Sequence, residues 1–136
     1  MAIRVVRLGT PRSREEGIRL GTVRRPPRGV AKSEFGKRDY YDVWLPELAP
    51  SAGVVSWALA TPWTDARWRQ YARKYRREMR APHARHLIAT LAALSHQTNF
   101  SIGCYCENAE RCHRSLLREL LVADGADVVR EHRSRE

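Results

Sequence analysis

The chain has 136 residues and a mass of 15.7 kDa, with 25 basic and 15 acidic side chains that give a formal net charge of +10. This length predicts a single domain over residues 1–130, with 131–136 as a frayed tail. The hydrophobic content of 43% excludes wholesale disorder. No run approaches the roughly 18 apolar residues of a membrane span, and no signal-peptide core follows Met1. We therefore expect a soluble cytoplasmic protein without a membrane partner.

The basic excess is unevenly distributed along the chain. Arginine supplies 22 of the 25 basic side chains, and residues 1–38 hold eleven basic and three acidic ones, a net charge of +8. A positive segment of this kind favours an anionic partner, such as phosphate, a nucleotide or nucleic acid. The same charge also fits a solvated surface that only keeps the protein soluble, because charge alone does not determine specific binding.

Short apolar segments alternate with longer amphipathic ones in chain order. Strands rich in β-branched and aromatic residues are predicted at 3–8, 18–23, 40–45, 98–104 and 127–129. Helices are predicted at 54–59, 65–80, 82–94 and 115–123. Strands interleaved with helices predict an α/β fold, a single layered domain with a mostly parallel central sheet flanked by helices.

Three groups of apolar residues are expected in the core. The apolar face of helix 65–80 comprises Trp68, Tyr71, Tyr75 and Met79, which recur at helical spacing among many arginines. The apolar face of helix 82–94 comprises Leu87, Ile88, Leu91 and Leu94. Trp44 and Leu45, at the end of the third strand, are also expected to be buried.

A basic loop separates the second and third predicted strands. Residues 24–39 contain two prolines and two glycines, too many for a regular element. A loop of this length in a small domain is typically functional or mobile. Its arginines Arg24, Arg25 and Arg28 are therefore candidate ligands for a phosphorylated or nucleotide-like molecule.

The most informative segment is 102–115, IGCYCENAERCHRS, which predicts a strand, a loop and the start of a helix. Ligands of α/β sheets bind at the carboxyl ends of strands, and a helix start offers free backbone amides to an anion. Arg114, as a bidentate clamp, and Ser115 are thus candidate ligands for a phosphate or carboxylate. Cys112 at the same helix start is a candidate nucleophile, and His113 is a candidate acid or base.

Other interpretations of this segment stay open. An odd number of cysteines argues against a disulfide framework. A metal site for zinc or iron would use Cys104, Cys106, Cys112 and His113, although their spacing is not that of a zinc finger. A phosphatase- or rhodanese-type anion loop would run from Cys106 to Arg111, but it lacks glycine and carries Glu107 and Glu110. Packing alone explains any one buried cysteine, but it is a poor explanation for three at one junction.

The same segment resembles a known family. Cys104 at a strand end, an acidic loop and the run Cys112-His113-Arg114-Ser115 resemble the signature of the domain of unknown function 488 family. Segment 41–51 and the basic loop after Val23 resemble further parts of that family. Cys106 is a departure, because many members carry an acidic residue there. The resemblance implies a small Rossmann-like α/β domain, and it implies no established reaction.

Two classes of function therefore compete. In the first, loop 24–28 folds over the strand ends, and a pocket at 104–115 binds an anionic small molecule on which Cys112 or His113 acts. In the second, the protein is a basic nucleic-acid-binding or adaptor protein with a structural Cys/His metal cluster, and phosphates lie along helix 65–80. The first requires loop 24–28 to lie beside His113.

Overall fold

The computed structural model describes residues 1–129, and its centre is one parallel sheet. The strands are β1 (Ile3–Arg7), β2 (Ile18–Gly21), β3 (Val43–Trp44) and β4 (Phe100–Cys104), in the order β1-β4-β2-β3. The helices are α1 (Ala52–Leu59), α2 (Asp65–Glu78), α3 (Pro82–Leu94) and α4 (His113–Ala123). The predicted α/β fold with a parallel sheet is confirmed; its Rossmann-like character stays a prediction. No helix within residues 1–129 is long and apolar enough to cross a bilayer.

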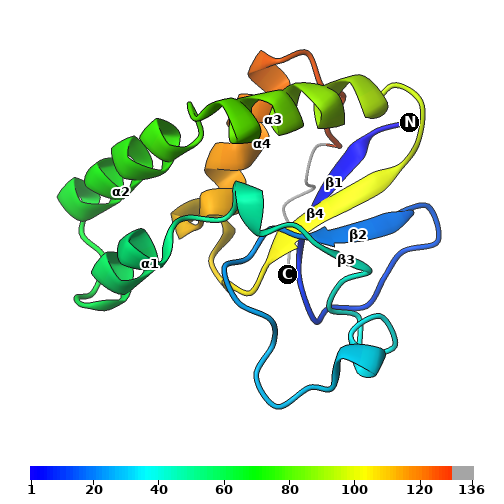
Figure 1. Ribbon diagram of the computed structural model, residues 1–136, viewed down its shortest axis with the longest axis horizontal. Helices are drawn as coiled ribbons and strands as arrows, with labels where there is room; N and C mark the ends of the chain where they lie inside the picture. The colour runs from blue at the N-terminus through cyan, green and yellow to red at the C-terminus, as the bar shows by residue number, and fades with distance from the viewer. Residues whose placement is uncertain (130–136) are drawn as a thin grey trace, which may run out of the picture.

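The main core lies between the sheet and helices α2, α3 and α4, which gather on one side of it in Figure 1. The predicted apolar face of α2 is confirmed, because Tyr71, Tyr75 and Met79 are buried and Trp68 packs against them. Two predictions are wrong: Trp44 and Leu94 are each 43% exposed. Trp44 lies on an edge strand of two residues, and its indole N–H donates to the Val23 carbonyl.

Local signals set most helix ends. The hydroxyl of Thr64 accepts from the Arg67 amide at 3.1 Å, and Pro82 begins α3. Gly125 ends the last helix with φ +88°, a left-handed conformation that favours glycine. Helix α4 begins at His113, two residues earlier than predicted.

The first, second and fourth strands are one to two residues shorter than predicted, and the other two predicted strands differ more. The third strand was expected over 40–45 but contains only Val43 and Trp44, because Tyr41 is buried against Gly21 on the neighbouring strand. The last strand reduces to one parallel bridge, in which Val128 pairs with Ile3 beside β1. The expected frayed tail at 131–136 lies outside the described residues.

Candidate functional site

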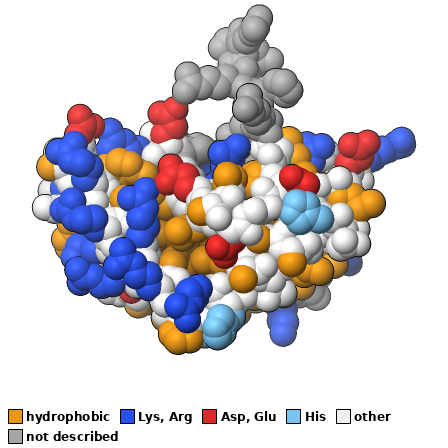
Figure 2. Space-filling view, turned by 90° about the horizontal axis from the view of Figure 1, so that it is seen from above, with side chains coloured by type: hydrophobic (Ala, Val, Ile, Leu, Met, Phe, Trp, Pro, Cys, Tyr) orange, Lys and Arg blue, Asp and Glu red, His pale blue; other side chains and the backbone are white. Residues whose placement is uncertain are grey.

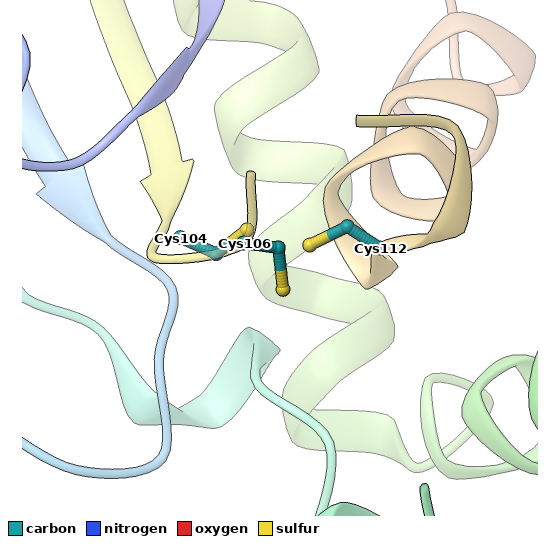
Figure 3. A group of neighbouring side chains, drawn as sticks. All are labelled: Cys104, Cys106 and Cys112. Atoms are coloured by element: carbon teal, nitrogen blue, oxygen red, sulfur yellow. The ribbon is translucent and has the colours of Figure 1, made fainter. Parts of the chain in front are cut away.

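Three thiols meet where β4 ends and α4 begins. Cys104 is the last residue of β4, Cys112 caps the N-terminus of α4, and Cys106 lies in the loop between them. Their three sulfur atoms all lie within 4.8 Å of one another. In Figure 3 the three side chains converge on one point between the strand end and the helix start. Cys104 and Cys112 are each 1% exposed, whereas Cys106 is exposed.

The thiols differ strongly in acidity. Hydrogen bonds with Cys104 and Cys112 lower the pKa of Cys106 to about 3, and the positive charge of Arg114 acts in the same direction. The hydrogen bond to Cys106 raises the pKa of Cys104 to about 12. Hydrogen bonds to Cys104 and Cys106, together with burial, also raise the pKa of Cys112 far above that of a free thiol. Cys106 is thus the exposed member of the cluster and the one whose pKa is lowered.

His113 and Arg114 occupy the first turn of α4 beside this cluster. His113 is 5% exposed; its Nε2 lies 2.6 Å from the Thr22 carbonyl oxygen and its Nδ1 lies 3.8 Å from the Cys112 sulfur. The carbonyl can only accept, so Nε2 carries the proton. Burial lowers the pKa of His113, which keeps the ring neutral. Arg114 is 4% exposed, and its Nε and Nη1 atoms have no hydrogen-bond partner among the described residues.

A pocket of about 740 Å³ opens over the thiols. Its cationic lining comes from loop 24–28 and from the turn before α4, and comprises Arg24, Arg25, Arg28 and Arg111. Its apolar lining includes Tyr40, Val55, Leu59, Trp63, Tyr71 and Tyr105. Cys104, Cys106, Cys112 and His113 also line it. None of the described residues that line it is Asp or Glu.

Hydrogen bonds hold the basic loop over the carboxyl end of β4. The Arg24 guanidinium donates to the carbonyls of Pro46, Ala49 and Pro50. The Tyr105 hydroxyl donates to the Arg25 carbonyl at 2.9 Å. Loop 24–28 therefore lies beside His113, as the pocket interpretation requires.

A comparison with protein families identifies the family of this chain. The family model described as "Active DUF488-N3 subclade" matches residues 3–125. The chain belongs to the DUF488 family. No curated protein and no solved structure matches it significantly. The matched range includes the whole segment from Cys104 to Ser115, on which the sequence resemblance rested.

The predicted ligands of the DUF488 protein separate into two groups. Arg24, Arg25 and Arg28 line the pocket, although Arg24 already donates to three carbonyls. Arg114 and Ser115 do not line it. The Ser115 hydroxyl donates to the Cys112 carbonyl at 2.8 Å, and the Arg114 guanidinium is buried.

The structure brings together only part of the predicted metal-ligand set, and amides of the predicted anion loop are already paired. The ligand atoms of the three cysteines meet, whereas His113 is not in that group, although its Nδ1 lies 3.8 Å from the Cys112 sulfur. Two amides of the loop from Cys106 to Arg111 already have hydrogen-bond partners within the loop. The Glu110 and Arg111 amides both donate to Asn108, to its side chain and its carbonyl respectively.

Several pocket residues were not predicted from the sequence. Trp63 and Tyr71 line the pocket, and Tyr71 belongs to the helix face that was assigned only to the core. Arg111 donates to Asp65 through Nη2 at 2.6 Å and keeps a buried, unpartnered Nη1. The sequence places Arg111 five residues after Cys106, but this spacing was interpreted as a phosphatase- or rhodanese-type anion loop and not as part of a pocket wall.

A second basic surface lies outside the pocket. Arg69, Arg73, Arg76 and Arg80 recur at intervals of four, three and four, so they share one exposed face of α2 and its end. Figure 2 shows many Lys and Arg side chains at the end of the molecule where α2 lies. Arg76 pairs with Glu119 at 2.9 Å. We call this surface the α2 basic face.

Proposed function

We propose that this DUF488 protein is an enzyme that binds an anionic, phosphate- or nucleotide-like molecule in the pocket and attacks it with Cys106. The observation that carries the proposal is the presence of an accessible, acidic thiol in a pocket with four arginines and no described carboxylate. A thiolate is the nucleophilic form of cysteine.

The arginines support an anionic ligand. Arg25 and Arg28 are exposed at the pocket wall, and Arg111 has one buried nitrogen without a partner. Guanidinium groups bind phosphate and carboxylate through paired hydrogen bonds. The pocket therefore offers donors and positive charge with no competing carboxylate in its described lining.

The remaining lining supports a ligand with a flat apolar part. The rings of Trp63 and Tyr71 pack edge-to-face, with 5.3 Å between their centroids. Tyr40 and Tyr105, which also line the pocket, form a second edge-to-face pair. Small-molecule sites typically have volumes of about 300–1,000 Å³ and mostly apolar walls. A nucleotide combines a phosphate for the arginines with a base for the rings.

The geometry favours Cys106 over Cys112 as the nucleophile. Cys112 is 1% exposed and its raised pKa keeps it protonated, so it is a poor nucleophile. In the proposed step the Cys106 sulfur bonds to the electrophilic atom of the ligand, and the leaving group departs with the electron pair and takes up a proton. Water then breaks the bond to sulfur and restores the thiolate. His113, held by Thr22, positions Cys112.

Binding of adenosine 5′-monophosphate, followed by the fluorescence of Trp63 and its neighbours, tests the pocket. Replacing Arg28 with Ala is expected to weaken binding by about tenfold or more, because a charged hydrogen bond contributes roughly 1.5–3 kcal/mol. Arg85→Ala, on the exposed surface of α3, is the matched control and should leave affinity unchanged. Equal affinity of all three proteins, or no binding of the nucleotide or of inorganic phosphate, contradicts the proposal.

A soft metal ion is a second candidate for the same thiols. Three sulfurs within 4.8 Å fit zinc or iron, and the net negative charge of a divalent ion with three thiolates would be balanced by the buried Arg114. Elemental analysis of protein purified without chelator or metal-affinity resin tests this. About one equivalent that is lost in Cys112→Ser supports it; less than about a tenth of an equivalent counts against it.

The α2 basic face supports nucleic-acid binding as the other candidate function. Arg69, Arg73 and Arg80 of this face are exposed to solvent. Binding of an oligonucleotide should then fall steeply with salt, because counterions are released. Affinity that hardly changes between low and moderate salt, or no binding at all, excludes this function.

A further inference from the structure

Cys106 differs from the other two cysteines in its access to solvent. It is exposed and lines the pocket, whereas the sulfurs of Cys104 and Cys112 are buried beside it within 4.8 Å (Figure 3). We infer that Cys106 is a site of reversible oxidation by hydroperoxides, and that Cys112 resolves the oxidised form as a Cys106–Cys112 disulfide. The inference shares with the proposed function only the use of Cys106 as the reactive thiol.

The surroundings of Cys106 match those of redox-sensitive cysteines. Such cysteines are accessible, have thiolate character and lie next to a second thiol. Access comes from the pocket, and the second thiol is in place. The buried Arg114 guanidinium in the first turn of α4 places a positive charge near the thiols.

Cys112 is a better partner for Cys106 than Cys104 is. Cys104 belongs to β4, which pairs with β1 and β2 on both sides, and its carbonyl accepts from the Leu8 amide at 2.8 Å. Cys112 lies six residues from Cys106, beyond the exposed turn that begins at Glu107. A disulfide needs the sulfurs about 2.05 Å apart, so one side of the pair must shift. Loop 106–111 can shift without breaking the sheet.

The chemistry balances with a hydroperoxide as the oxidant. The Cys106 sulfur attacks the terminal peroxide oxygen, so an S–O bond forms and the O–O bond breaks. The alkoxide or hydroxide leaves with the electron pair and takes up a proton, and Cys106 becomes a sulfenic acid. The Cys112 thiol then loses its proton and attacks that sulfur, forming the S–S bond while the oxygen leaves as water. A low-molecular-weight thiol returns both cysteines to the reduced state by exchange.

Oxidation would remove the nucleophile from the pocket. In the disulfide, the Cys106 sulfur is bonded to Cys112 and cannot attack a ligand, and neither sulfur can bind a metal. The reduced protein would work on its ligand, and the oxidised protein would be inactive until a thiol restores it. The device thus links the proposed activity to the redox state of the compartment.

Mass spectrometry after treatment with a small excess of hydrogen peroxide tests the inference. The full-length reduced protein is oxidised, blocked with iodoacetamide and digested with trypsin, which cleaves after Arg111 and after Arg114. Cys112 is thereby separated from the peptide that carries Cys104 and Cys106. We expect the intact mass to fall by two hydrogens, the Cys112 peptide to be crosslinked to the peptide that carries Cys104 and Cys106, and fragmentation of this pair to place the bond on Cys106. Dithiothreitol should reverse both changes.

Two variants separate the roles of the thiols. Cys104→Ser should still form the crosslink, whereas Cys112→Ser should accumulate one to three oxygen atoms on Cys106 instead. No crosslink in the wild type, a crosslink to Cys104 alone, or equal overoxidation of Cys106 in the wild type and in Cys112→Ser overturns the inference. Nucleotide binding by the reduced protein is measured separately. Absence of nucleotide binding would contradict the proposed function without affecting the oxidation result, and absence of the crosslink would contradict the redox inference without affecting the binding result.

Discussion

Arg114 is a buried cation whose guanidinium has two nitrogens without partners among the described residues. From its place at a helix start, the sequence predicted a clamp on an external anion. The structure instead buries the guanidinium below the pocket, where its charge lowers the pKa of Cys106 and Cys104. The nearby thiolate provides the negative charge that a buried cation needs. Arg114 is therefore not part of the described pocket wall, and we infer that it acts on the thiols through its charge.

Arg114→Gln should raise the pKa of Cys106, because a neutral amide removes the positive charge that favours the thiolate. Arg114→Lys keeps the charge and should largely restore the low pKa. The thiolate absorbance near 240 nm, followed from acid to neutral pH, reports the change. If both variants titrate like the wild type, Arg114 has only a packing role.

Glu16 and Arg19 form a buried ion pair on the other face of the sheet. The Arg19 Nε donates to Glu16 at 2.6 Å, and the Ser101 hydroxyl donates to the same carboxylate at 2.7 Å. Burial acts to raise the pKa of Glu16, but these hydrogen bonds outweigh it, so the pKa lies below the ordinary 4.5. The folded state thus binds this proton less readily than the unfolded chain does.

Glu16→Gln should lower the free energy of unfolding by about 3–5 kcal/mol near neutral pH, because Arg19 is left buried without its counter-charge. The stabilisation from Glu16 is fully present above the unfolded pKa and is lost as pH falls through the lowered folded pKa. The difference between variant and wild type should therefore shrink in acid. Urea unfolding at about pH 7 and about pH 3 measures it. An equal difference at both pH values contradicts this account.

At the scale of elements, the order strand, loop, helix around the cysteines follows from local patterns. The apolar run before Cys104, the polar loop after it and the apolar helix before Gly125 each carry their own signal, and all three are present in the structure. Which thiol is accessible was not predictable. Cys112, at the N-terminus of α4, is buried because the helix packs on β4 and α2. The contacts with α2 join segments that are distant in the chain, so local sequence patterns do not show them.

Gly21, the last residue of β2, lies directly against the ring of Tyr41. A Cβ atom built on Gly21 would collide with the Tyr41 ring, so only glycine fits at this position without a shift of Tyr41. The Tyr41 ring lies 5.2 Å from Phe35 and belongs to the small cluster that also holds Cys104 and Cys112. Tyr41 therefore connects the end of β2 to the thiol site.

Gly21→Ala should destabilise the protein by about 1–3 kcal/mol, the usual cost of overpacking a core, because Tyr41 must move. Gly53→Ala is the matched control, since Gly53 lies in α1 with no atom closer than 4.0 Å, and alanine is favoured in a helix. Thermal unfolding of both variants compares them. A Gly21→Ala variant as stable as Gly53→Ala contradicts the close packing.

At the scale of the whole molecule, much of the N-terminal positive charge is used internally. Arg12 binds Asp42 at 2.6 Å, Arg19 binds Glu16, and Arg24 binds backbone carbonyls. A count of charges along the sequence cannot separate these arginines from free ones, because their partners are distant in the chain. The cations left for a ligand include Arg25 and Arg28 at the pocket, so the net charge overstates the free basic surface in this part of the chain.

The most direct test of the account is the rate at which iodoacetamide alkylates Cys106, measured from about pH 6 to 9 with and without adenosine 5′-monophosphate. A free thiol has a pKa of about 8.5, so its rate would rise steeply over this range. We predict that Cys106 reacts rapidly already at about pH 6, that its rate changes little up to pH 9, and that the nucleotide slows the reaction. A rate that climbs with pH like that of a free thiol, and that the nucleotide does not affect, would contradict a ligand pocket built around a Cys106 thiolate.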